Sequence, residues 1–116
     1  IDDEVDPDDP WSAAAHETLG LLERATDARG RALEITRLPD PIDIRGTGDD
    51  FVSSYVNYYV CNGAVIAPQF GDRRADAEAR EILTGLYPGR EVVQLNIDAL
   101  GASGGGIHCA TQQQPA

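Results

Sequence analysis

The stretch SSYVNYYVCNGAVIAPQ (residues 53–69) contains two runs rich in Tyr, Val and Ile on either side of Asn62-Gly63. Aromatic and β-branched residues favour strands, and Asn-Gly is a preferred centre for a two-residue hairpin turn. The sequence therefore predicts a β-hairpin with strands over residues 53–61 and 64–69.

The residues after the hairpin predict a helix followed by two further strands. Asp72 can cap the helix, and Pro88-Gly89 can end it. The apolar residues of this helix recur at helical spacing: Ala75, Ala79, Ile82, Leu83 and Leu86. Beyond it we expect a strand over residues 91–95, a glycine-rich loop, and a last strand over residues 107–112.

The residues before the hairpin predict a helix over residues 10–29, with Asp9 as its cap and Gly30 as its stop. A strand over residues 32–37 and an irregular loop over residues 39–50 follow. The fold class is therefore α/β in the mixed (α+β) sense. A faint repeat supports a modular arrangement, because Gly30-Arg31 and Gly89-Arg90 both lead from a helix toward a strand. Two copies are also compatible with coincidence.

With 116 residues, 41% hydrophobic and 25% charged, the chain has the size and composition of one folded domain. It contains neither a run of ~20 apolar residues nor a signal-peptide profile, so we expect no membrane partner. The chain begins at Ile1 and lacks Met, which suggests a processed product or a piece of a longer protein.

The net charge of −11 argues against a nucleic-acid partner, which would require dense positive charge. Residues 1–9 form an acidic lead-in. The chain lacks Lys, which excludes a Schiff-base mechanism and the Lys-bearing phosphate loop. An acidic surface favours cationic small molecules, although it can equally serve solubility. The two cysteines do not suggest a disulfide framework, so a reducing compartment is expected.

Cys109 follows the glycine-rich run of residues 101–106, a type of loop that lets backbone approach a ligand. It can be a nucleophile or a buried structural cysteine, and spacing leaves both open. If residues 107–112 form a strand, His108 faces away from Cys109. His16 is expected to be exposed on the first helix. No complete Cys-His pair is evident, and the Cys and His spacing predicts no metal site.

Asn57 is a polar amide within an apolar segment. Burying an amide is costly unless its hydrogen bonds are satisfied. Asn57 therefore belongs either to a satisfied internal network or to a surface that faces a polar ligand.

Four motifs occur in a specific order: SYVNYY (54–59), VIAPQFGD (65–72), YPGR (87–90) and GGGIHCATQQ (104–113). Together they resemble the C-terminal part of agmatine deiminases and bacterial-type peptidylarginine deiminases. The resemblance implies a pentein fold, a five-bladed propeller of ββαβ units in proteins roughly three times as long. Residues 1–116 would then be a single C-terminal fragment in which residues 10–116 form about two propeller modules.

By this resemblance Cys109 is the nucleophile, and Asn57, Gly105 and Gly106 bind substrate. The implied reaction is hydrolytic deimination of a guanidine, agmatine to N-carbamoylputrescine and ammonia, through an S-amidino-cysteine. The catalytic His and the guanidinium-binding acids would lie in earlier segments. Ala110 replaces a larger aliphatic residue of the family motif. Peptidylarginine deimination and an inert structural fragment remain alternatives.

The expected partners are a small cationic guanidine substrate, the remainder of the parent chain and further copies of the protein. We expect no cofactor, a cytoplasmic location and a role in polyamine metabolism, namely putrescine biosynthesis. The isolated chain is expected to be inactive, because it lacks a suitably placed His and the substrate-binding acids.

Overall fold

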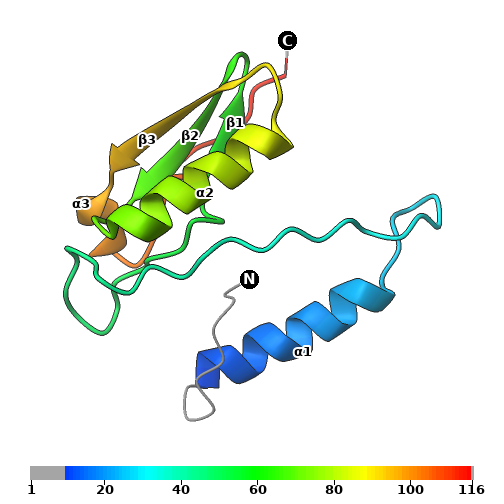
Figure 1. Cartoon of the computed structure of the whole chain (residues 1–116), viewed down its shortest axis with the longest axis horizontal. Helices are drawn as coiled ribbons and strands as arrows, with labels where there is room; N and C mark the ends of the chain where they lie inside the picture. The colour runs from blue at the N-terminus through cyan, green and yellow to red at the C-terminus, as the bar shows by residue number, and fades with distance from the viewer. Residues whose placement is uncertain (1–9, 116) are drawn as a thin grey trace. The chain divides into compact units, whose positions relative to one another are not determined.

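The computed structural model describes residues 10–115 (Figure 1). The acidic lead-in over residues 1–9 and the predicted cap Asp9 lie outside the described residues. The chain divides into two compact units between Leu38 and Pro39, and each unit is described by itself.

In the first unit, helix α1 spans Pro10–Arg24 and ends five residues before the predicted end at residue 29. The Asp27 side chain accounts for the early end. It accepts hydrogen bonds from the backbone N–H groups of Arg29 and Arg31 at 2.8 and 3.0 Å, and from Arg31 Nε at 2.7 Å. These bonds stabilise a turn in place of further helix.

The predicted strand over residues 32–37 is wrong. One isolated antiparallel bridge joins Thr26 to Ala32, and Gly30, with φ of 77°, lies in the turn between them. Residues 33–38 have no regular secondary structure. Alternation of apolar and polar residues indicates which face a strand would bury. A strand also needs a neighbouring strand to pair with, and residues 10–38 of this unit do not supply one.

The second unit contains a three-stranded sheet of β1 (Tyr59–Cys61), β2 (Ala64–Gln69) and β3 (Glu91–Asn96) in that order. β1 and β2 are antiparallel and meet at the turn Asn62-Gly63, in which Gly63 has a φ of 79°. β2 and β3 are parallel. The hairpin and the strand after the helix are thus confirmed, although β1 is shorter than the predicted strand.

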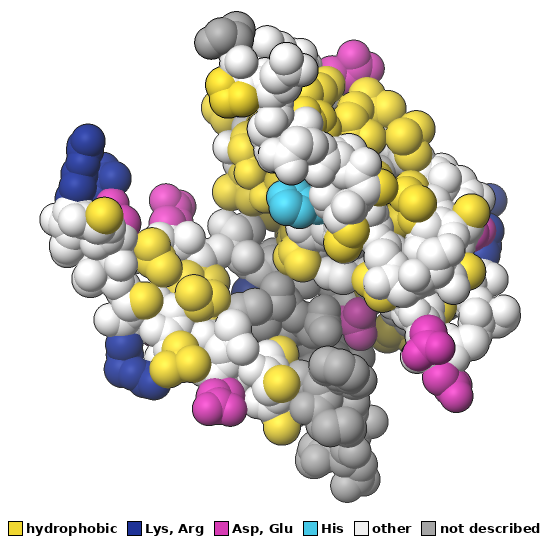
Figure 2. Space-filling model, turned by 180° about the vertical axis from the view of Figure 1, so that it is seen from behind, with side chains coloured by type: hydrophobic (Ala, Val, Ile, Leu, Met, Phe, Trp, Pro, Cys, Tyr) yellow, Lys and Arg dark blue, Asp and Glu magenta, His cyan; other side chains and the backbone are white. Residues whose placement is uncertain are grey.

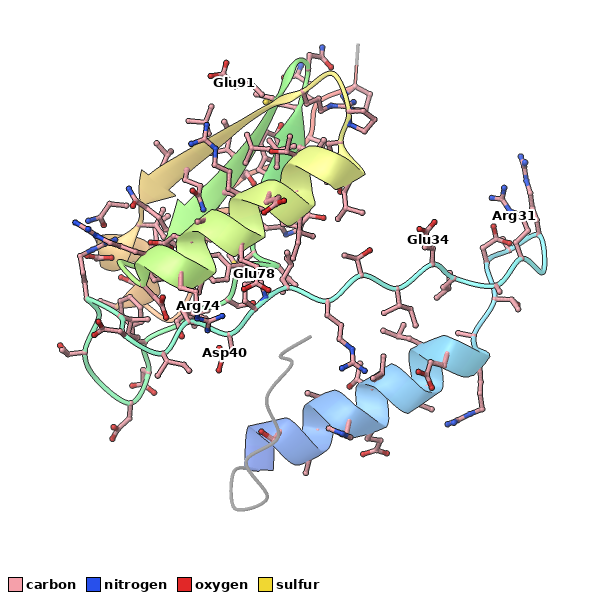
Figure 3. All side chains as sticks on the ribbon, in the orientation of Figure 1. Arg31, Glu34, Asp40, Arg74, Glu78 and Glu91 are labelled. Atoms are coloured by element: carbon pink, nitrogen blue, oxygen red, sulfur yellow. The ribbon has the colours of Figure 1, made fainter. Side chains whose placement is uncertain are left out.

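Helix α2 (Arg73–Leu86) connects β2 to β3 and covers one face of the sheet (Figure 1). The predicted cap is confirmed, because Asp72 Oδ1 accepts the backbone N–H groups of Arg74 and Ala75 at 3.1 Å each. The fully buried residues of α2 belong to the predicted stripe: Ala75, Ala79 and Leu83. Arg74 and Glu78 form an ion pair of 3.1 Å along the exposed side of the helix (Figure 3).

The prediction of a last strand over residues 107–112 is also wrong. The chain forms a short helix α3 (Asp98–Gly101) and then a 3₁₀ turn η1 (His108–Ala110). The Thr111 hydroxyl donates to the carbonyls of Ile107 and His108 at 3.0 and 3.2 Å, which closes the turn. A short alternating run cannot be distinguished by periodicity from a turn closed in this way.

Large hydrophobic side chains remain exposed in the second unit, among them Val56, Leu86 and Leu95. Figure 2 shows hydrophobic side chains at the surface on the face that it displays. In the part of the chain that the structure describes, none of the helices has the length and hydrophobicity of a bilayer-spanning segment.

Candidate active site

Two segments distant in the sequence, residues 51–57 and 98–109, lie together in the second unit. The Val52 N–H donates to the Gly101 carbonyl at 3.1 Å. The Phe51 ring lies so close to Gly46 and Gly101 that a Cβ at either glycine would overlap it. Both glycines are therefore required to admit the aromatic ring, which fixes the start of the first segment against α3.

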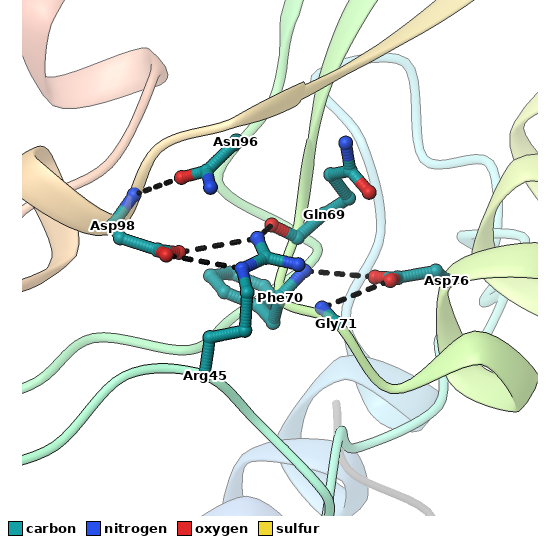
Figure 4. Close-up of polar contacts among 7 residues, drawn as sticks. All are labelled: Arg45, Gln69, Phe70, Gly71, Asp76, Asn96 and Asp98. Atoms are coloured by element: carbon teal, nitrogen blue, oxygen red, sulfur yellow. Dashed lines mark hydrogen bonds and ion pairs between the residues drawn. The ribbon is translucent and has the colours of Figure 1, made fainter.

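Arg45 links the loop before these residues to the end of β2 and to α3 (Figure 4). Its guanidinium donates to both carboxylate oxygens of Asp98, at 3.0 and 3.2 Å, and to the Gln69 carbonyl at 2.7 Å. This fork geometry is specific to Arg. The Arg45 guanidinium lowers the pKa of Asp98, and the Asp98 carboxylate raises the pKa of Arg45.

Asp76 in the first turn of α2 is a second anchor. It accepts hydrogen bonds from the backbone N–H groups of Phe70 and Gly71 at 2.8 and 3.0 Å (Figure 4) and from the Tyr55 hydroxyl at 2.7 Å. Tyr55 is buried, and this burial is the main cause that raises the pKa of its hydroxyl, with the Asp76 contact adding to it. The Tyr55 bond holds the segment that leads to Asn57.

Asn57 contacts the turn that carries Cys109. Its Oδ1 accepts the His108 backbone N–H at 2.8 Å, and its Nδ2 lies 3.3 Å from Cys109 Sγ. Because only the carbonyl end of an amide can accept a backbone N–H, the His108 contact directs the NH₂ end toward the sulfur. The Asn57 side chain therefore meets both the backbone and the thiol of the turn.

Cys109 is exposed and free in the described part of the chain. The Asn57 hydrogen bond lowers the pKa of its thiol, and a backbone hydrogen bond from Gly106 lowers it further. The thiolate is the nucleophilic form of cysteine. An exposed thiol with a lowered pKa is suited to attack on an electrophilic carbon.

Residues 108–110 form a 3₁₀ turn, in which side chains do not alternate as they do in a strand, so the predicted alternation of His108 and Cys109 does not apply. His108 is exposed, and its backbone N–H, rather than its imidazole, contacts Asn57. Asn57 itself lies in a turn closed by a 3.2 Å bond from its N–H to the Ser54 carbonyl, not in a strand.

The two glycines assigned to the site differ in their surroundings. A Cβ on Gly105 would make ordinary van der Waals contact with Cys109 Cβ at 3.6 Å, whereas a Cβ on Gly106 would overlap the Asn57 amide. Within residues 10–115 no group of three or more His, Cys, Asp or Glu side chains is arranged to hold a metal ion.

The sequence did not reveal Arg45, Asp76 or Asp98 as supports of this site. Arg45 and Asp98 are 53 residues apart, and no local pattern links them. Asp76 resembles any acid in the first turn of a helix. Only the folded arrangement shows that these three residues hold the segments around Asn57 and Cys109.

Comparison with known proteins identifies the family. The model of the Porphyromonas-type peptidyl-arginine deiminase family matches residues 1–115. The chain belongs to this family. Among curated relatives, it is 39% identical to the agmatine deiminases of Pseudomonas savastanoi pv. phaseolicola and of Medicago truncatula. In both alignments, 96% of this chain covers 35% of the relative.

The solved structure of the Enterococcus faecalis agmatine deiminase superposes with a TM-score of 0.84 at 30% identity, covering 99% of this chain and 36% of that one. The chain thus spans about a third of the length of the relatives it matches. The predicted fold class, a mixed α/β part of a pentein deiminase, is confirmed by this overlap. The division into about two propeller modules stays a prediction.

Proposed function

We propose that this chain supplies the nucleophile for the hydrolytic deimination of a guanidine substrate, with agmatine as the preferred compound. The observation that carries the proposal is the exposed Cys109 thiol, contacted at 3.3 Å by the Asn57 amide, in a chain similar to agmatine deiminases. The lowered pKa of the Cys109 thiol increases the thiolate fraction near neutral pH.

In the proposed reaction the Cys109 thiolate attacks the guanidinium carbon and forms a C–S bond. The C–N bond to a terminal nitrogen breaks, and that nitrogen leaves as ammonia after accepting a proton. Water then attacks the S-amidino carbon, and the C–S bond breaks to release the ureido product and the thiolate. Agmatine and water thus give N-carbamoylputrescine and ammonia. Covalent catalysis divides one difficult displacement into two easier steps.

Three further residues have proposed roles at the substrate. Asn57 donates through Nδ2 to the thiolate, and Gly105 and Gly106 bind the substrate through the backbone of the loop that leads to Cys109. A guanidinium stays protonated at neutral pH, so its site requires carboxylates. We assign these carboxylates, and the His that moves the protons, to segments of a longer parent chain, which makes the 116 residues alone inactive.

Peptidylarginine deimination is the second candidate, and the description of the matching family model favours it. The two reactions share the nucleophile and the guanidinium, and they differ in what binds the remainder of the substrate. We further propose a cytoplasmic enzyme of polyamine metabolism that forms homo-oligomers. The two free cysteines fit a reducing compartment.

The test is to incubate a longer protein that contains these residues with agmatine and, separately, with an arginine-containing peptide. Release of ammonia together with N-carbamoylputrescine supports the first candidate, and peptidyl-citrulline supports the second. An ester reporter serves as a control for acyl transfer by the same cysteine. Turnover of the ester without turnover of either guanidine would overturn the proposal.

A further inference from the structure

Gly106 lies directly beneath the Asn57 side chain. It is buried, and a Cβ built on it would overlap Asn57 Cγ and lie 2.6 Å from Nδ2 and 2.7 Å from Oδ1. Real Cβ atoms do not approach other atoms so closely. The Asn57 amide therefore occupies space that any residue other than glycine would fill.

We propose that Gly106 is a positioning residue for Cys109: because it has no side chain, it leaves the room from which the Asn57 amide reaches the Cys109 thiol. Its importance for catalysis rests on the proposed function, in which Cys109 is the nucleophile. The effect of Gly106 on the Cys109 thiol does not rest on the proposed function, and it can be measured without substrate.

A Cβ at Gly106 would collide only with atoms of the Asn57 side chain among its nearest neighbours. The overlapping atoms belong to the tip of a side chain, so the fold can accept a methyl group at Gly106 if Asn57 rotates away. That rotation would break the 2.8 Å bond from the His108 N–H and remove Nδ2 from Cys109 Sγ. His108 is exposed, so water can replace the Asn57 contact to its backbone N–H, and the loss falls on the thiol more than on stability.

Gly105 provides a matched control on the same loop. Its backbone does not need a positive φ, and its Cβ would make only an ordinary contact of 3.6 Å with Cys109 Cβ. Gly105→Ala therefore adds the same methyl group one residue away without displacing Asn57. A general stiffening of the glycine loop would affect both variants alike.

The experiment measures the pH dependence of Cys109 alkylation by iodoacetamide in the full chain carrying Cys61→Ser, which leaves one thiol. We expect Gly106→Ala and Asn57→Ala each to raise the thiol pKa, with a rate near neutral pH that falls about tenfold for each unit of increase. Gly105→Ala is expected to retain the parental profile. Circular dichroism confirms that each variant is folded.

The double variant Asn57→Ala/Gly106→Ala decides whether Gly106 acts through Asn57. With the amide removed, the methyl group at position 106 has free space, so the double variant should match Asn57→Ala alone. Additive effects, or a parental profile for Gly106→Ala, would overturn the proposal. The proposed function has its own test in guanidine turnover, and failure there would leave these alkylation results intact.

Discussion

The Tyr55 hydroxyl donates a 2.7 Å hydrogen bond to Asp76 Oδ1, which ties the segment ending at Asn57 to the first turn of α2. Tyr55 is 2% exposed, and its ring packs edge-on against Phe70 with the ring centroids 5.2 Å apart. Tyr55 thus joins the chain two residues before Asn57 to the buried core of the second unit.

Tyr55→Phe keeps this ring packing and removes the donor. Because the bond joins a hydroxyl to a carboxylate, we expect the free energy of unfolding to fall by about 1–3 kcal/mol. Chemical denaturation monitored by circular dichroism measures the change. Tyr59→Phe in β1 is the control, since the Tyr59 hydroxyl has no hydrogen bond within the described residues. An equal loss in both variants would contradict a specific role for the Asp76 bond.

Asp72 predicts how stability depends on acid. Backbone N–H groups, first that of Ile42 and then that of Ala75, lower the pKa of its carboxyl to about 2, from an ordinary value of 3.8. A lowered folded-state pKa stabilises the fold fully above the unfolded value, and the contribution is lost as the pH falls through the folded value. The window is therefore between about pH 4 and pH 2.

Asp72→Asn should accordingly lower the denaturant midpoint at pH 6, and the difference from the parent chain should shrink as the pH approaches 2. The amide keeps an acceptor oxygen but loses the charge that holds N–H groups of α2 and of the preceding loop. Asp49→Asn, on the exposed loop, is the matched control. A difference between parent and variant that stays constant with pH would contradict the assignment.

Local signals in the sequence identified the elements that local forces determine. The turn at Asn62-Gly63, the cap at Asp72 and the buried stripe of α2 depend on residues within a few positions of one another. Such interactions can be predicted from spacing alone. The order β1, β2, α2, β3 follows from them, which is why the central architecture was predicted correctly.

The geometry of the candidate site could not be predicted from the sequence, and the roles of its residues stay a prediction. Cys109 is singled out by the glycine-rich run before it, and Asn57 by its polar amide within an apolar segment; the motif resemblance then assigns their roles. Both are expected on strands, and both lie in turns. Their contact spans 52 residues, and no periodicity encodes a contact at that separation. The geometry of the site depends on contacts that form only in the folded chain. Thr111 closes the turn that carries Cys109, and Gly106 leaves space for the Asn57 amide.

Two glycine substitutions should change stability in opposite directions. Gly85 lies in α2 with no atom within 4 Å of an added Cβ, so Gly85→Ala should stabilise by about 0.5–1 kcal/mol by reducing the freedom of the unfolded chain. At Gly101 the added Cβ would lie 2.7 Å from the Phe51 ring, and Gly101→Ala should destabilise by about 1–3 kcal/mol. Denaturation midpoints of the two variants test this, and shifts of the same sign would contradict it.

The isolated chain should self-associate unless it is joined to the rest of a parent chain. β1 and β3 are the outer strands of the sheet in the described residues. Leu86 at the end of α2 and Leu95 in β3 are 42% and 45% exposed. Unpaired strand edges and exposed apolar side chains recruit other strands. Static light scattering at low micromolar concentration measures the mass. A monomer that unfolds cooperatively would show that the chain is self-sufficient.

Cys109→Ser tests the proposed nucleophile in a longer protein that has measurable deiminase activity. A hydroxyl at this position has nearly the size of the thiol but is not ionised near neutral pH, so covalent attack on a guanidinium carbon should almost cease. We expect kcat to fall at least about a thousandfold, while circular dichroism and the denaturation midpoint stay close to the parental values, since Cys109 is exposed. Cys61→Ser is the matched control, because Cys61 is half-buried in β1, where its thiol donates to the Ala64 carbonyl at 3.5 Å, a bond that Ser can retain. This control should keep near-parental activity. Near-parental turnover in Cys109→Ser would remove Cys109 from the mechanism, and it would leave the Asn57 contact as a structural feature of the turn.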